Sequence, residues 1–148
     1  MATSKDVMSN KVLTANSNIR FDKLMKVFVD MGIHHIPITN ENGSLEGIVS
    51  STDALKAYHE MEYVLQRNGV SVETKIDLKE ILTRDVITIS PDTKLSKVVR
   101  LMVENAAHAL PVLEDGELVG ILSAKDILSA IADGKLRVAS PDEYYYTT

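Results

Sequence analysis

Two short stretches of the chain, GIVSSTD at residues 47–53 and GILSAKD at residues 120–126, decide its fold. Each contains a serine and an aspartate three residues apart, a pairing that is typical of the first turn of a helix. Each also follows an Asn-Gly or Asp-Gly pair between two apolar runs, which favours a β-hairpin. The two stretches therefore predict the same local structure, a hairpin strand that leads directly into a helix.

The sequence around these stretches repeats as well. Residues 5–41 align with residues 79–115 at an offset of 74, and after one deletion residues 43–57 align with residues 116–130 at an offset of 73. Most of the aligned positions that are not identical are conservative. Identical and conservative positions follow each other in the same order in both stretches, with a single gap. Two copies of one structural unit therefore account for most of the chain.

Each copy is expected to have the order β-α-β-β-α, preceded by a short helical turn. Its first strand is a β-branched run, VLT or VITI, and an amphipathic helix follows. In the second copy, Pro91 and Asp92 suit the start of this helix. In the first copy, the last helix can run on through DALKAYHEMEYVLQ to a stop at Asn68 and Gly69. The apolar positions of the amphipathic helix are Phe21, Leu24, Met25, Phe28 and Val29 in the first copy and Leu95, Val98, Val99, Met102 and Val103 in the second.

The repeat also predicts the domain organisation and the fold class, which is mixed α/β. A unit of about 55 residues is marginal alone, because small domains bury too little surface. Two copies that pack together would remove this problem. The expected segments are a first repeat at 5–60, a linker of helix extension and loop at 61–78, a second repeat at 79–134 and a C-terminal tail at 135–148.

The composition excludes several classes of protein. The chain has 148 residues, of which 45% are hydrophobic and 25% charged, an ordinary globular balance. It contains no cysteine, so neither a disulfide framework nor a thiolate zinc site is possible. A net charge of −5 without a basic run argues against nucleic-acid binding. Since no apolar stretch approaches the ~20 residues that span a bilayer, we expect a soluble, cytoplasmic protein with no membrane partner.

The duplicated pattern resembles the cystathionine-beta-synthase (CBS) domain. The features that carry the resemblance are a VIT-type strand, an amphipathic helix, an apolar strand with a central proline, a turn and then GI(V/L)SxxD, all present twice. The resemblance implies a Bateman module, in which two repeats pack with pseudo-twofold symmetry and bind adenosine-containing ligands in clefts between them. It also implies a stand-alone regulatory module rather than an enzyme. Such modules commonly form homodimers and regulate a client enzyme, channel or transporter.

The Ser-x-x-Asp stretches allow two interpretations, which are compatible with each other. In the first, serine caps the helix and the aspartate lies in its first turn, and no ligand is needed. In the second, the serine hydroxyl and the free N–H groups of the helix hold a phosphate, while the carboxylate accepts the ribose hydroxyls. The serine can cap the helix in the empty state and contact the ligand in the bound state.

The resemblance assigns residues to two ligand sites, each combining the Ser-x-x-Asp of one repeat with residues of the other. Lys125 occupies the position of Thr52, and a cation at a helix N-terminus opposes the helix dipole, so it hints at a bound anion; a side chain that simply faces solvent explains it equally well. We therefore expect tighter binding and longer phosphate chains at the Asp126 site. Site one comprises Ser50, Thr52, Asp53, Thr88, Ile89, Ala107 and His108, and site two comprises Ser123, Lys125, Asp126, Thr14, Ala15, Ile33 and His34.

No pattern in the sequence predicts catalysis, a cofactor or a metal. His34 and His108 occupy equivalent positions, yet no H-x-x-x-H or H-E-x-x-H spacing accompanies them, and packing or ligand contact explains them better. The expected function is a sensor of AMP, ADP or ATP. The alternatives are a sensor of S-adenosylmethionine or NAD, and a constitutive oligomerisation module whose clefts stay empty. Wide apolar stripes on the first helix of each copy favour a homodimer.

Overall fold

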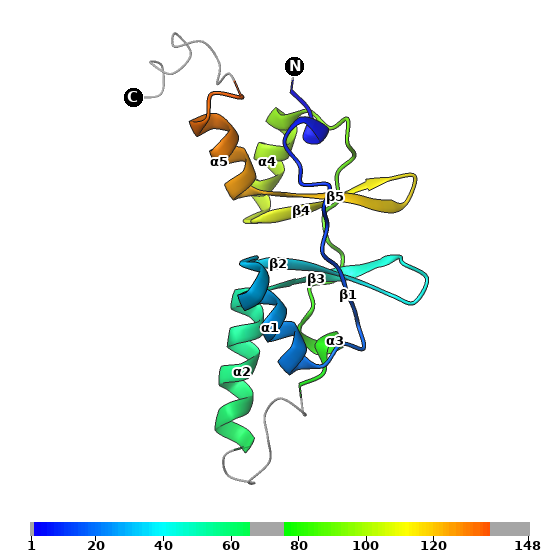
Figure 1. Cartoon of the computed structure of the whole chain (residues 1–148), viewed down its shortest axis with the longest axis vertical. Helices are drawn as coiled ribbons and strands as arrows, with labels where there is room; N and C mark the ends of the chain where they lie inside the picture. The colour runs from blue at the N-terminus through cyan, green and yellow to red at the C-terminus, as the bar shows by residue number, and fades with distance from the viewer. Residues whose placement is uncertain (1, 66–75, 137–148) are drawn as a thin grey trace. The chain divides into compact units, whose positions relative to one another are not determined.

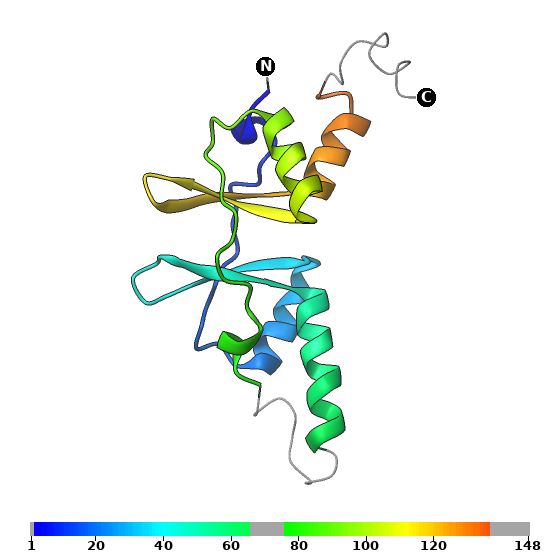
Figure 2. The ribbon, with the colours of Figure 1, turned by 180° about the vertical axis from the view of Figure 1, so that it is seen from behind.

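The computed structural model of the chain describes residues 2–65 and 76–136, and they form two compact units. The first-repeat unit comprises Leu13–Ile87 and Asp115–Leu118. The second-repeat unit contains residues before Leu13, together with Thr88–Glu114 and residues from Val119 onward. Both units contain helices and strands, so the predicted mixed α/β class is confirmed (Figures 1 and 2).

The first-repeat unit is a three-stranded sheet with two helices on one face. β2 and β3 form the predicted antiparallel hairpin, and β1 pairs with β2 in parallel at the edge. Figure 1 shows α1 and α2 side by side on one face of this sheet, with the short α3 close by. The elements are β1 (Ala15–Asn16), α1 (Phe21–Met31), β2 (His35–Thr39), β3 (Leu45–Ser50), α2 (Ser51–Leu65) and α3 (Leu78–Ile81).

The second-repeat unit has the same arrangement. β4 and β5 form its hairpin, and Ile89 makes a parallel bridge to Val112 where the first-repeat unit has β1. The helices α4 and α5 follow the same order in the chain as α1 and α2. The elements are η1 (Ser4–Asp6), α4 (Leu95–Asn105), β4 (Ala109–Glu114), β5 (Glu117–Ser123) and α5 (Ala124–Ala132).

The predicted first strands are wrong in place in the first repeat and in length in the second. In the first repeat the strand is Ala15–Asn16 rather than VLT at 12–14, and in the second only Ile89 forms a bridge. Residues 12–14 lie where the chain passes from one unit to the other, which leaves little length for pairing. The Asn16 side chain then accepts a hydrogen bond from the Asn18 N–H at 3.0 Å and turns the chain away from the sheet.

The prediction that Pro91 and Asp92 start α4 is wrong, because these residues form a turn before it. The N–H of Thr93 donates to the Ser90 carbonyl, and the N–H of Ser90 donates to the Thr93 hydroxyl. Proline is favoured early in such a turn, and α4 begins only at Leu95. The end of α2 at Leu65 agrees with the predicted run, whereas the expected stop at Asn68 and Gly69 lies outside the described residues.

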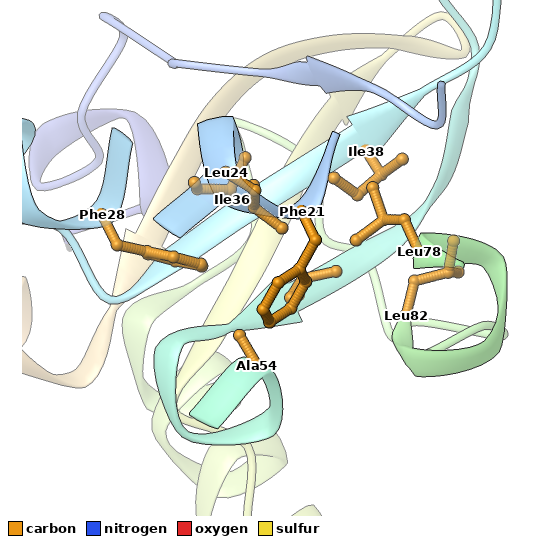
Figure 3. Close-up of a cluster of buried hydrophobic side chains, with 9 residues drawn as sticks. Phe21, Leu24, Phe28, Ile36, Ile38, Ala54, Leu78 and Leu82 are labelled. Carbon is orange, nitrogen blue, oxygen red and sulfur yellow. The ribbon is translucent and has the colours of Figure 1, made fainter. Parts of the chain in front are cut away.

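The core of the first-repeat unit forms between α1 and the sheet. Of the five α1 positions that the sequence singled out, Phe21, Leu24 and Phe28 are buried and pack on apolar residues of the strands (Figure 3). Met25 is only partly buried, and Val29 is exposed. In α4, likewise, Leu95, Val98 and Met102 are buried, whereas Val99 and Val103 are exposed. Leu24, Ile36 and Ile38 are completely inaccessible to solvent. The cluster consists of Phe21, Leu24, Phe28, Ile36, Ile38, Val49, Ala54, Leu78 and Leu82.

The segment at the beginning of each repeat lies on the sheet of the other repeat's unit. Ser9 pairs with Ile121 of β5 through two backbone hydrogen bonds of 3.0 Å each. Thr83 pairs in the same way with Ile48 of β3, at 3.1 and 2.9 Å. Each hairpin therefore gains an antiparallel neighbour from a segment that is remote from it in sequence, and we call residues 2–9 and 77–83 the leading segments.

Candidate functional site

The first candidate site lies where β3 ends at Ser50 and α2 begins. The Ser50 hydroxyl accepts a hydrogen bond from the Asp53 N–H at 3.0 Å and lies 3.2 Å from the Thr52 hydroxyl. The Asp53 side chain is exposed, and within the described residues its carboxylate makes no hydrogen bond. The N–H of Ser51 donates to the His34 carbonyl at 2.8 Å. His34 therefore lies beside the Ser-x-x-Asp junction of its own repeat.

The second candidate site repeats this arrangement with one addition. The Ser123 hydroxyl accepts a hydrogen bond from the Asp126 N–H at 3.1 Å, and the Ser123 N–H donates back to the Asp126 carboxylate at 2.9 Å. This is a complete capping box, so the expectation that serine caps the helix holds at this junction. The N–H of Ala124 donates to the His108 carbonyl at 2.8 Å, while the Lys125 side chain is exposed.

Both junctions have groups suited to a phosphorylated or otherwise substituted nucleoside. A helix N-terminus carries N–H groups without helical partners and a partial positive charge, both of which favour an anion. A serine hydroxyl beside it can donate to the same anion, and a carboxylate can accept hydrogen bonds from a vicinal diol. Among residues 2–65 and 76–136 the Asp53 carboxylate has no hydrogen-bond donor, whereas at Asp126 one oxygen already accepts the Ser123 N–H.

Each predicted site combines residues of both units, so the two sites remain predictions. Thr14 and Ala15 line an open groove of about 610 Å³ with Leu13 and Ile19, along the edge strand β1. Ile89 is buried, and its backbone is committed to the sheet. The first-repeat unit holds Ser50, Thr52, Asp53, Thr14, Ala15, Ile33 and His34, and the second-repeat unit holds Ser123, Lys125, Asp126, Thr88, Ile89, Ala107 and His108.

The sequence analysis did not identify the leading segments as neighbours of the two junctions. In the second-repeat unit, the leading segment bridges β5 at Ile121, two residues before Ser123. Val7 and Asp126 line the same groove of about 450 Å³. A signal for this contact was present, because Gly120 lies inside a strand, and a strand glycine often marks the close approach of another backbone. An added Cβ at Gly120 would lie 3.0 Å from the Ser9 carbonyl oxygen.

The described residues contain neither a cluster of metal-binding side chains nor a helix that could cross a membrane. Within residues 2–65 and 76–136, no group of three or more His, Cys, Asp or Glu side chains is placed to hold a metal ion. No helix in the same ranges combines the length and the apolar character needed to cross a bilayer.

Comparison with known proteins settles which family this fold represents. The sequence profile described as "CBS domain" matches residues 5–60 and again residues 78–133, together more than half of the chain. The chain belongs to the CBS domain family. Each of the two matches contains one of the Ser-x-x-Asp junctions described above. This CBS chain therefore consists mainly of two consecutive CBS domains.

Solved structures with this fold include CBS domain pairs bound to adenosine derivatives. One pair, determined in complex with 5′-methylthioadenosine and S-adenosyl-L-methionine, is 34% identical, with a TM-score of 0.75 over 92% of this chain and 99% of that chain. A protein from Methanocaldococcus jannaschii is 31% identical, with a TM-score of 0.77 over 87% of this chain and 47% of that chain. Both likenesses support the CBS fold described here.

Curated relatives include longer enzymes. A homoserine O-acetyltransferase of Methanococcoides burtonii is 35% identical over 82% of this chain but only 22% of the relative. An L-aspartate semialdehyde sulfurtransferase of Methanocaldococcus jannaschii is 35% identical over 88% of this chain and 23% of the relative. The CBS chain thus spans less than a quarter of these relatives, and its likeness to them does not extend to their whole length.

Proposed function

We propose that this CBS chain is a regulatory module, and not an enzyme, that binds an adenosine-containing ligand at its Ser-x-x-Asp junctions. The observation that carries the proposal is the duplicated junction, in which a serine hydroxyl, a helix N-terminus and an aspartate lie together at Ser50–Asp53 and at Ser123–Asp126. A diol-binding carboxylate next to an anion-binding helix start suits the ribose and the 5′ substituent of one nucleoside. The 34% identical CBS pair with two adenosine derivatives bound supports the same ligand class.

The ligands considered are AMP, ADP, ATP, S-adenosylmethionine and NAD. All contain adenosine, and they differ in the charge and length of the 5′ substituent. Neither junction contains a residue that reads the number of phosphates directly, although Lys125 offers a cation at one of them. The proposed outcome of binding is regulation of a client enzyme or transporter.

Ligand binding is expected to raise the melting temperature of the protein. A ligand at 100 times its dissociation constant adds about 2.7 kcal/mol to the free energy of unfolding, which corresponds to a shift of roughly 5–10 °C for a chain of this size. The measurement is a thermal melt with each of AMP, ADP, ATP, S-adenosylmethionine, 5′-methylthioadenosine and NAD. Loss of the shift in the double variant Asp53→Ala, Asp126→Ala, and its retention in the exposed control Asp30→Ala, would support the junctions as the site. If no adenosine compound shifts the melt, the proposal fails.

We also propose that the protein is a homodimer. Each unit exposes apolar side chains on its pair of helices, and four of these side chains form two pairs of repeat equivalents. Val29 on α1 and Val103 on α4 are 80% and 76% exposed, and Leu55 on α2 and Leu128 on α5 are 65% and 66% exposed. Large apolar side chains exposed on a surface often mark an interface. A twofold interface brings the same surface of both subunits together, so that these side chains can pack against their own copies.

Sedimentation equilibrium at tens of micromolar is expected to give twice the chain mass. The variant Val29→Glu, Val103→Glu should shift the protein to monomer, because a charge buried without a partner opposes association. Both positions are largely exposed, so the fold should be retained. The control Asn42→Glu changes the β2–β3 turn, away from the helices, and should leave the mass unchanged. A monomeric wild-type protein would refute the homodimer and also the interpretation of the protein as an oligomerisation module.

A further inference from the structure

The two Ser-x-x-Asp junctions differ in charge although their backbones are equivalent. The second residue of the first helical turn is the neutral Thr52 in one repeat and the cationic Lys125 in the other, and both side chains are exposed. Both junctions retain the serine and the aspartate. Any difference in what they bind therefore arises from the surroundings of the 5′ substituent and of the carboxylate.

The state of the carboxylate differs as well. At Asp126 the carboxylate is half-buried, and one oxygen accepts the Ser123 N–H at 2.9 Å. At Asp53 the carboxylate is exposed and makes no hydrogen bond within the described residues. A hydrogen bond from an N–H and a neighbouring ammonium group both offset negative charge. The Ser50 junction is consequently the more electronegative of the two.

We propose that the junctions sort adenosine ligands by the charge of the 5′ group, an inference that rests on the proposed function. The Ser50–Asp53 junction accepts an adenosine with a neutral or cationic 5′ sulfur group, and the Ser123–Asp126 junction accepts an adenosine 5′-phosphate. A phosphate carries up to two negative charges at neutral pH, so it is repelled by an uncompensated carboxylate and attracted by Lys125. A thioether carries no charge, and a sulfonium is a cation that a free carboxylate favours.

With this sorting, one small chain responds to two different classes of adenosine ligand. The CBS pair at 34% identity was solved with both a thioether and a sulfonium derivative of adenosine, so a related fold accepts 5′ sulfur groups. In the present chain, Lys125 adds a phosphate-selective position that Thr52 does not provide. The two ligand classes should therefore bind at the same time rather than compete.

The test is calorimetric titration with 5′-methylthioadenosine and AMP, which share adenosine and differ at the 5′ position. Wild-type protein saturated with one compound is expected to bind the other with unchanged affinity. Lys125→Thr should lower the affinity for AMP at least about tenfold, which is the effect of losing one charge-assisted contact. The affinity for methylthioadenosine should not change. Thr52→Lys should create a second AMP site and lower the affinity for S-adenosylmethionine by a similar factor. Both substitutions are at exposed positions, so folding should be retained.

The outcomes separate this inference from the proposed function. Competition between the two compounds for one site, or an AMP stoichiometry that Thr52→Lys leaves unchanged, overturns the sorting while ligand binding itself stands. An absence of heat with every adenosine compound overturns both. The exchange variant Thr52→Lys, Lys125→Thr provides the matched control, because it should move AMP to the first junction without changing the net charge of the chain.

Discussion

Replacing Gly47 by alanine is expected to destabilise the first-repeat unit by about 3 kcal/mol or more. Gly47 lies in β3 directly under the leading segment of the second repeat, and an added Cβ would overlap the Thr83 carbonyl oxygen and the Leu82 side chain. A backbone oxygen cannot rotate away as a flexible side chain can. The pairing of Thr83 with Ile48 must therefore open for the methyl group to fit. The measurement is chemical denaturation of the wild-type protein and the variant.

Two other glycine variants serve as controls for this effect. At Gly120 the nearest atom to an added Cβ is the Met8 sulfur at 2.7 Å, the end region of a flexible side chain, so Gly120→Ala should destabilise less than Gly47→Ala. At Gly43 an added Cβ meets nothing within 4 Å, and only the positive φ of 81° opposes it. Gly43→Ala should therefore cost about 1 kcal/mol. Equal melting temperatures for wild type and Gly47→Ala would show that β3 and the leading segment are not in contact.

Deleting residues 2–9 is expected to destabilise the second-repeat unit by about 3–5 kcal/mol, since several backbone hydrogen bonds are lost together. Ser4 is fully buried, and its N–H donates to the Thr93 carbonyl at 2.9 Å. Ser9 supplies both backbone bonds to Ile121, so β5 loses its outer neighbour. Amide hydrogen exchange should show faster exchange at Ile121, whereas β3 of the other unit acts as an internal reference.

The control for the deletion is Lys5→Ala. This substitution removes the exposed ion pair between Lys5 and Asp92, whose charged atoms are 3.2 Å apart, and keeps the backbone of the segment. An exposed ion pair contributes only about 0–1 kcal/mol, so exchange at Ile121 should remain slow. If the deletion leaves Ile121 as protected as in the full chain, the assignment of the leading segment to this unit is wrong. The deletion should also weaken ligand binding at the Ser123–Asp126 junction, because Val7 and Asp126 line the same groove.

Local pattern was sufficient to predict the elements that depend on neighbouring residues. The apolar spacing in α1 predicted a buried face, and Phe21, Leu24 and Phe28 are buried, whereas Val29, which was predicted with them, is exposed. The Asp115-Gly116 pair predicted the β4–β5 turn, and both residues adopt positive φ angles. Ser-x-x-Asp predicted a capped helix at each junction. These features form within a few residues of each other, so the sequence contains nearly all the information that specifies them.

The start of α4 and the length of the first strands could not be predicted in the same way. Pro91 is compatible with a helical first turn and with a β-turn, and the hydrogen bonds of Thr93 to Ser90 favour the turn. Residues 12–14 have strand propensity, yet a strand also needs a neighbouring strand to pair with. In the first repeat, β2 provides that neighbour at Ala15 and Asn16, directly after the predicted run.

The sequence by itself determined that this protein has two copies of one CBS unit, where their hairpins and helices lie, and that each copy carries a serine and an aspartate at a strand–helix junction. Only the tertiary structure decided that each leading segment pairs with the sheet of the other repeat's unit, and that Asp126 closes a capping box while Asp53 stays free. The reason is physical. Helix caps and turns are selected by interactions over three or four residues, whereas the partner of an open strand edge is selected by which remote backbone can approach it closely, and Gly47 and Gly120 permit that approach.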